Sequence, residues 1–254
     1  WVILFCNITA GIGILENAAP MVQDYFPALS AAAAAGFVGL LSLANMGGRF
    51  IWSSASDVIG RKNIYMVYLG AGLAFYFVLA VYGHTSLALF VGCALVLLSF
   101  YGGGFASIPA YLRDLFGVYQ VGAIHGRLLT AWSAAGVAGP LIINTVVERQ
   151  ASRGNSGPEL YQLSLYVMCV LLAMGLISNV LVRPVAQRWF EDPDKVAAKV
   201  ESDRAAVLGA QQESGGKTGT AHAPVAGVLA LVIAALLVYG LWETAVKASQ
   251  MFAG

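Results

Sequence analysis

The sequence predicts an all-α membrane protein. Of its 254 residues, 59% are hydrophobic and only 11% are charged, whereas soluble domains carry about 25% charged residues. Several uncharged stretches approach the roughly 20 apolar residues that a helix needs to cross a bilayer. The net charge is +1 and no basic run interrupts the chain, which argues against a nucleic-acid partner and makes the lipid bilayer the expected one.

Seven apolar stretches are expected to be membrane helices, and short polar segments join the first six. Pro20 is expected to break the first of them, and Pro109 to end or kink the fourth, because proline has no N–H group for a helical hydrogen bond. The chain begins without Met or a signal sequence, so it reads as the middle of a longer protein. The expected helices cover residues 1–17, 31–53, 64–82, 87–108, 127–147, 161–182 and 224–243.

The positive charges predict an orientation and three regions. Placing the loop 54–63 in the cytoplasm leaves only Arg149, Arg153 and Lys247, of the fourteen Lys and Arg residues, on the outer side. Residues 1–185 would then form a six-helix bundle, residues 186–223 a cytoplasmic amphipathic tail and linker, and residues 224–254 an additional membrane helix. The protein is expected in the cell membrane, crossing it several times.

Arg49 is a charged residue inside an expected membrane helix. An arginine at the centre of a membrane helix costs about 2.5–3.5 kcal/mol on insertion scales, so it usually faces a protein interior or a watery cavity. Asn45 lies one helical turn away on the same face, and Gly48 would let another helix or a substrate come close. A guanidinium fork suits a carboxylate, so we expect an anion contact. A structural ion pair with an acid elsewhere is the alternative.

The segment that follows has the charges of a tight hairpin. Asp57 lies at a helix end, Gly60 makes the turn, and Arg61 and Lys62 open the next helix. We expect these residues to brace the two helices at the cytoplasmic side. The spacing alone fits equally well with positive-inside topology and a simple turn.

Aromatic and small residues in the fourth and fifth helices suggest a cavity wall. Tyr101 and Phe105 are one turn apart beside three consecutive glycines, 102–104, which weaken a helix unless close packing or a cavity compensates. Trp132 is the bulky exception in a run of Ala and Gly, and a buried indole needs a partner for its N–H group. Core packing is the alternative for all three aromatic side chains.

Together these segments resemble a known transporter family. Gly48, Asp57, Gly60, Arg61 and Lys62 are similar to the inter-helix signature of the major facilitator superfamily (MFS). With "YGGGFASIPAYLRDLFG" and "VGAIHGRLLTAWSAAGVAGPLI", the chain resembles the oxalate:formate antiporter family over about residues 1–185. The resemblance implies the C-terminal six-helix half of a twelve-helix MFS transporter, in which the extra C-terminal transmembrane helix is an addition.

The resemblance also implies a substrate and a site. The family's aromatic-lined cavity uses an arginine of helix eight, which corresponds to Arg49, with Tyr101 and Trp132 as plausible cavity aromatics. Oxalate-transporting members also carry a lysine on helix eleven, whereas residues 127–147 contain none. We therefore expect transport of small carboxylates such as formate or oxalate-like acids, with a monovalent acid favoured, by antiport or proton symport.

Two further expectations complete the site. Glu16, near the outer end of the first helix, is a candidate proton carrier or ion-pair partner, although a hydrated acid at the mouth is the commoner case.

No HExxH, GxSxG or phosphate-binding glycine loop is present, so we expect no enzyme, no cofactor and no metal site. The alternative to transport is a non-transporting membrane sensor or accessory subunit built on the same six helices.

Overall fold

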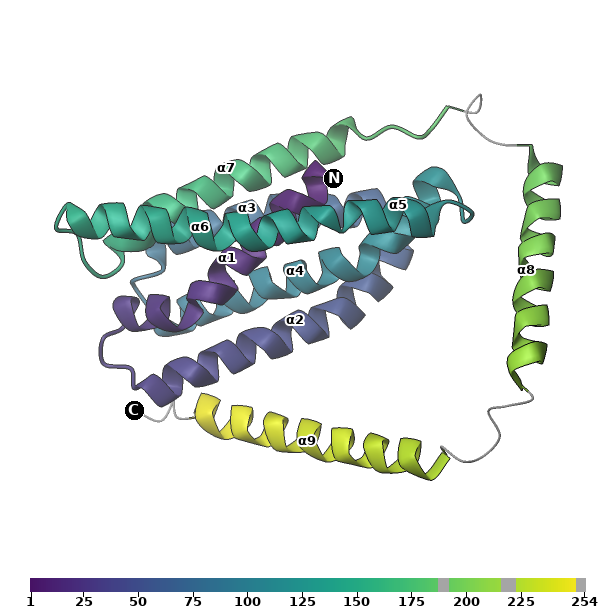
Figure 1. The fold of residues 1–254 in the computed structure, drawn as a ribbon. Coiled ribbons are helices and arrows are strands. Elements are labelled where there is room, and N and C mark those ends of the chain that lie inside the picture. The colour runs from purple at the N-terminus through teal and green to yellow at the C-terminus, as the bar shows by residue number, and fades with distance from the viewer. Residues whose placement is uncertain (187–191, 216–222, 250–254) are drawn as a thin grey trace. The chain divides into compact units, whose positions relative to one another are not determined.

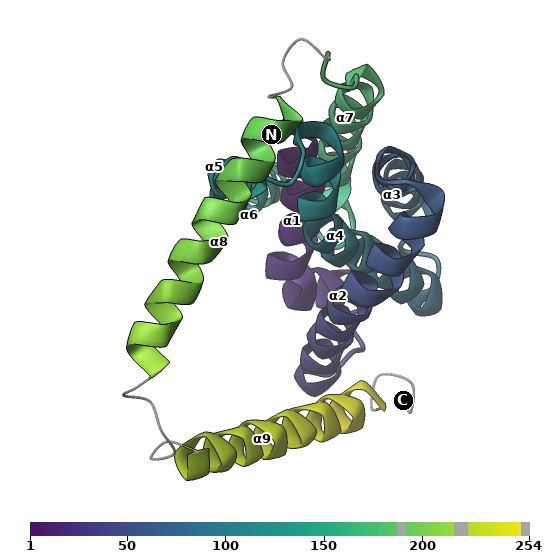
Figure 2. The ribbon, with the colours of Figure 1, turned by 90° about the vertical axis from the view of Figure 1, so that its right-hand side faces the viewer.

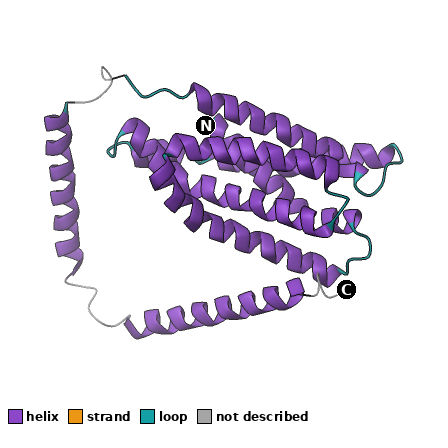
Figure 3. Cartoon of the chain, turned by 180° about the vertical axis from the view of Figure 1, so that it is seen from behind, coloured by secondary structure: helices purple, strands orange, loops and turns teal. Residues whose placement is uncertain are grey.

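The computed structural model describes residues 1–186, 192–215 and 223–249, and these residues form helices joined by loops, with no strand among them (Figure 3). Contacts divide the chain into one compact unit covering Trp1–Arg183 and Thr244–Gly254, and a second covering Pro184–Glu243. Residues 187–191 and 216–222, which belong to the expected tail and linker, lie outside the described residues.

Six helical segments of the first unit are long and apolar enough to cross a membrane. The fold is therefore that of a multi-helix membrane protein, as the composition predicts. The segments are α1 (Val2–Tyr25), α2 (Ala31–Ile59), α3 (Arg61–Tyr82), α4 (Leu87–Phe116), the pair α5 (Val121–Leu128) and α6 (Thr130–Ser152), and α7 (Glu159–Leu181) (Figure 1).

Helix α1 is the central element of the bundle and contacts α2, α4, α6 and α7 (Figure 2). Helix α2 packs mainly on α4, and α3 packs on α4 and α7. Small residues make the close crossings possible. Ala131, Ala135 and Gly139 form one buried stripe of α6, and a Cβ atom at Gly139 would lie 2.9 Å from the carbonyl oxygen of Thr9 in α1.

Several helices end later than expected: α2 runs to Ile59 and α6 to Ser152, and two helices continue through a proline. Helix α1 continues through Pro20 to Tyr25, and α4 continues through Pro109 to Phe116. Each proline costs its helix one hydrogen bond, but the turns that follow remain buried: Met21 and Val22 in α1, and Leu112 in α4. Burial of these apolar side chains offsets the lost hydrogen bond.

The expected fifth helix, residues 127–147, corresponds to α6, and the short helix α5 precedes it in a segment that was expected to be a connection. Helices α5 and α6 meet at Leu129, where the backbone keeps helix-like torsion angles of φ −60° and ψ −19°. The break lies three residues before Trp132, so this side chain projects from the first turn of α6.

The hairpin between α2 and α3 turns on Gly60, as expected. Its φ of +92° and ψ of 143° belong to a region that only glycine occupies without strain. Ser30 caps the other end of α2 by accepting a hydrogen bond from the Ala33 backbone N–H at 3.1 Å.

Replacing Gly60 by alanine should lower the free energy of unfolding by about 1–3 kcal/mol. The cost is one of backbone conformation, because a Cβ atom at Gly60 would lie 3.8 Å from its nearest neighbour. Thermal unfolding in detergent measures this loss of stability. Gly92→Ala is the control, since Gly92 is helical and a Cβ atom there would have no neighbour within 4 Å. Equal melting temperatures for the two variants would refute this prediction.

The C-terminal part contains two further helices, α8 (Pro193–Gly215) and α9 (Ala223–Ser249). The apolar residues of α8 are spread around the helix rather than gathered on one side. Large apolar side chains of α9, among them Leu231, Leu236 and Trp242, are exposed. The insertion of α9 in the membrane stays a prediction.

Candidate functional site

The structure brings together the aromatic residues singled out in the sequence and Arg49. The Arg49 guanidinium carbon lies 5.3 Å from the centre of the Phe105 ring, within the range of a cation–π interaction. Phe105 in turn meets Trp132 edge to face, with ring centres 5.9 Å apart. Residues of α2, α4 and α6 therefore form one continuous group, which we call the Arg49 cluster: Arg49, Tyr101, Phe105 and Trp132.

Tyr101 anchors this cluster to the central helix. Its ring packs on Gly11 of α1, where a Cβ atom would lie only 2.6 Å from the ring carbon Cγ. Trp132, Arg49 and Glu16 all lie near its hydroxyl. Nothing in the sequence connects Glu16 with the aromatic side chains, because it lies on a different helix.

The Arg49 cluster occupies the surface of the bundle rather than its core. Arg49 and Glu16 are exposed, and Trp132 keeps 47% of its surface accessible, whereas Tyr101 is buried at 7%. Arg49 makes no ion pair within the part of the chain that the structure describes. At the helical rise it lies about 15 Å from the end of α2, too deep for its head to reach the interface easily.

Asn45 takes a different place from the one expected. Its side-chain oxygen lies against Gly102 in the α2–α4 contact, 2.7 Å from where a Cβ atom would stand, and it has no hydrogen-bond partner among the described residues. Asn45 therefore packs between α2 and α4. It lies against Gly102, the residue that follows Tyr101 of the Arg49 cluster.

The three consecutive glycines of α4, residues 102–104, each contact a different neighbour. Gly102 faces Asn45 of α2, Gly103 faces Trp52 of α2 and Tyr68 of α3, and Gly104 faces Asn7 of α1. Close packing thus explains the run of glycines that helix propensity disfavours. Trp52 also donates a hydrogen bond from Nε1 to the Ser99 hydroxyl at 3.0 Å.

The charged residues of the hairpin between α2 and α3 form a second network, separate from the Arg49 cluster. Arg61 pairs with Asp57 and with the hydroxyl of Ser56, and its Nε lies 3.7 Å from Asp114 of α4. The Arg61 side chain is 11% exposed. The hairpin is therefore tied to α4 as well as closed on itself.

Lys62 and Asn179 extend the network to the last helix of the bundle. Lys62 Nζ donates to the carbonyl oxygens of Val180 and Val182 at 3.0 and 2.7 Å, which satisfies the end of α7. The fully buried Asn179 donates to the Lys62 carbonyl oxygen and accepts from the Tyr111 hydroxyl, both at 3.0 Å. Sequence reasoning missed Asn179 and Tyr111, although an asparagine inside an apolar helix is a signal of such a role.

Replacing Asn179 by leucine should destabilise the protein by about 1–3 kcal/mol, because it leaves the buried Tyr111 hydroxyl without its partner. Thermal unfolding of Asn179→Leu, Tyr111→Phe and the double variant measures the coupling. Both single variants should lose stability, and the double variant should lose less than their sum. Strict additivity would show that the hydrogen bond contributes nothing.

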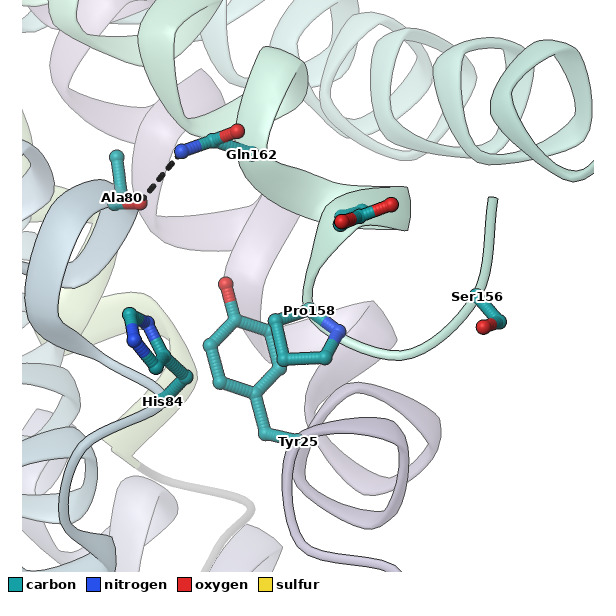
Figure 4. Close-up of a pocket in the computed structure, with 7 residues that line it drawn as sticks. Tyr25, Ala80, His84, Ser156, Pro158 and Gln162 are labelled. Atoms are coloured by element: carbon teal, nitrogen blue, oxygen red, sulfur yellow. Dashed lines mark hydrogen bonds between the residues drawn. The ribbon is translucent and has the colours of Figure 1, made fainter. Parts of the chain in front are cut away.

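A separate pocket of about 410 Å³ lies where α1 and α3 end and α7 begins (Figure 4). Gln162 closes one side by donating a hydrogen bond to the Ala80 carbonyl oxygen at 3.2 Å. None of the expected site residues contributes to it. The pocket is lined by Tyr25, Ala80, His84, Ser156, Pro158, Glu159 and Gln162.

The described residues contain no group of three or more His, Cys, Asp or Glu side chains placed to hold a metal ion. Comparison of the chain with protein-family models, with curated proteins and with solved structures finds no match. The interpretation of the Arg49 cluster therefore depends on its geometry and chemistry.

Proposed function

We propose that the chain is the six-helix half of a secondary transporter that moves small organic anions by alternating access. Its substrates would be monocarboxylates such as formate. It would belong to the oxalate:formate antiporter family of the MFS, which its sequence resembles. In such transporters the substrate site lies near the bilayer midplane, between two repeats of the fold. The protein would reside in the inner or plasma membrane.

The observation that carries this proposal is that Arg49 has no ion-pair partner among the described residues. An intramembrane arginine that serves structure alone would be expected to meet a carboxylate, but Arg49 meets the face of Phe105 instead. That contact holds one side of the guanidinium and leaves its N–H groups available. These groups fit a carboxylate through two parallel hydrogen bonds.

The surroundings of Arg49 suit a small and singly charged anion. Trp132 and Phe105 offer apolar walls, and the Tyr101 hydroxyl offers a polar group beside them. One guanidinium balances one carboxylate, and no lysine follows on α6. Arg61 and Lys62 are engaged at the hairpin, where they would brace the cytoplasmic side during the transport cycle.

Counterflow in proteoliposomes that contain the full-length protein tests the proposal. Vesicles loaded with unlabelled formate should accumulate labelled formate transiently, and oxalate should compete more weakly. An imposed pH gradient without internal anion separates antiport from proton symport, since only symport responds to it. Absence of carboxylate counterflow from vesicles that hold correctly folded protein would favour the sensor or accessory-subunit alternative.

A further inference from the structure

The pocket at the ends of α1, α3 and α7 has no part in the transport proposal. Its volume of about 410 Å³ is in the range of pockets that hold small organic molecules. Helix α3 begins at the hairpin and ends at this pocket, so the predicted orientation puts the pocket on the outer side of the membrane. What the pocket binds can be inferred from its lining.

Tyr25 is the residue that marks the pocket as a binding site. It is only 7% exposed, because its ring packs on those of Phe90 and Tyr161, with ring centres 4.8 and 6.1 Å apart. Its hydroxyl makes no hydrogen bond among the described residues, and Figure 4 shows it pointing into the pocket between His84 and Pro158. Buried polar groups are nearly always paired, so this hydroxyl calls for a partner in the pocket.

The charges around the pocket favour a positively charged ligand. Glu159 lines the pocket, and no lysine or arginine of the described residues does so. The carboxyl ends of α1 and α3 lie there as well, and such ends carry partial negative charge. The amino end of α7 has the opposite sign, but Glu159 lies in its first turn and offsets it. Asp24, which accepts a hydrogen bond from the Tyr161 hydroxyl at 2.6 Å, adds a second carboxylate beside Tyr25.

The hydrogen-bonding groups of the pocket favour a ligand that donates. The Glu159 carboxylate is an acceptor. Gln162 uses its amide nitrogen to bind the Ala80 carbonyl oxygen, which leaves its side-chain oxygen to accept, and the Tyr25 hydroxyl can also accept. We propose that the pocket binds a primary ammonium group through Tyr25, Glu159 and Gln162. Such a group supplies one positive charge and three N–H donors.

A soluble amine and an ethanolamine lipid headgroup both carry a primary ammonium group. A lipid is a natural source because the pocket lies at the ends of three expected membrane helices. A quaternary ammonium has the same charge but no N–H group, so the pocket should distinguish the two kinds of cation. This inference does not depend on the transport proposal, because the Arg49 cluster and the pocket share no residue.

Thermal unfolding of the full chain in detergent tests the site with ethanolamine, against sodium chloride at equal ionic strength. At about ten times its Kd, ethanolamine should raise Tm by about 3–6 °C. Choline should raise Tm much less, because it cannot donate hydrogen bonds to the three acceptors. Equal shifts with ethanolamine and choline would overturn the assignment of a primary ammonium group.

Tyr25→Phe removes the hydroxyl and keeps the ring. It should raise the Kd of ethanolamine at least about tenfold, whereas Tm without ligand should stay the same or rise, since the hydroxyl has no protein partner to lose. Tyr161→Phe provides the contrast, because it loses the hydrogen bond to Asp24 and should lower Tm without ligand. Unchanged ethanolamine binding by Tyr25→Phe would overturn the proposal.

Glu159→Gln tests the charge of the pocket. It should raise the Kd of ethanolamine about fivefold, the size of one exposed ion pair. Glu148→Gln is the matched control, because Glu148 is an exposed acid of α6 that does not line the pocket. Equal effects of the two variants would show a general attraction of cations to the surface and would contradict a site at Glu159.

Nanodiscs separate the two sources of the ammonium group. If a lipid headgroup is the ligand, phosphatidylethanolamine should raise Tm above its value in pure phosphatidylcholine, and Tyr25→Phe should remove this rise. If the ligand is a soluble amine, only added ethanolamine should raise Tm. The absence of a rise with both phosphatidylethanolamine and ethanolamine would refute the site.

Discussion

Replacement of Arg49 by glutamine should strongly weaken carboxylate uptake while leaving the folded bundle intact. The variant loses the charge and the two parallel hydrogen bonds that a guanidinium gives a carboxylate. Removing one partner of such a charged pair costs at least about 2 kcal/mol, equivalent to a roughly thirtyfold higher half-saturation concentration. Initial rates of formate counterflow measure the loss.

Two matched variants make this result specific to the position. Arg49→Lys keeps the charge but not the planar fork, so it should retain partial uptake with weaker affinity. Arg149→Gln removes the same type of charge from the exposed last turn of α6 and should transport normally. If Arg49→Gln transports as well as Arg149→Gln at equal expression, Arg49 does not contact the substrate.

Replacement of Gly48 by alanine should produce the largest loss of stability among the glycine variants of α2. A Cβ atom there would overlap the backbone of Ser99 in α4, with Cα and the carbonyl carbon at 2.7 and 2.8 Å. Backbone atoms cannot swing aside as the end of a flexible side chain does, so the two helices must separate. Overpacking of this kind costs about 1–3 kcal/mol, which corresponds to a fall in Tm of roughly 2–12 °C.

The neighbouring Gly47 supplies the control. It lies in the same helix, but no atom comes within 4 Å of the place where its Cβ would stand. Gly47→Ala should therefore leave Tm unchanged or raise it slightly, since alanine favours a helix over glycine by about 1 kcal/mol. Equal losses for both variants would show that the α2–α4 contact at Gly48 does not determine the result.

The sequence predicts the helices better than it predicts their ends. Long apolar runs fix where α1 and α4 form, because each run must satisfy its backbone internally in a membrane. Pro20 and Pro109 suggested ends that the structure does not have. Whether a helix continues past proline depends on what the following turn buries, and that information lies in distant segments of the chain.

Some residues of the candidate site can be predicted from the sequence, and others are revealed only by the structure. Arg49, Phe105 and Trp132 stand out because a charge or a bulky ring breaks an apolar or small-residue pattern, and the structure brings these three side chains together. Tyr111 resembles an ordinary member of an apolar helix, and Asn179 stands out as polar but does not indicate its partners. Their partners lie on other helices, more than sixty residues away, so only the fold reveals the network that they complete with Lys62.

The central claim is that Arg49 meets a substrate carboxylate rather than an acidic side chain. A density map of the full-length protein with bound formate tests this most directly. We predict the formate oxygens beside the Arg49 guanidinium, with Tyr101 and Trp132 around them. A map that shows an Asp or Glu side chain paired with Arg49, and formate bound elsewhere or not at all, would contradict the account.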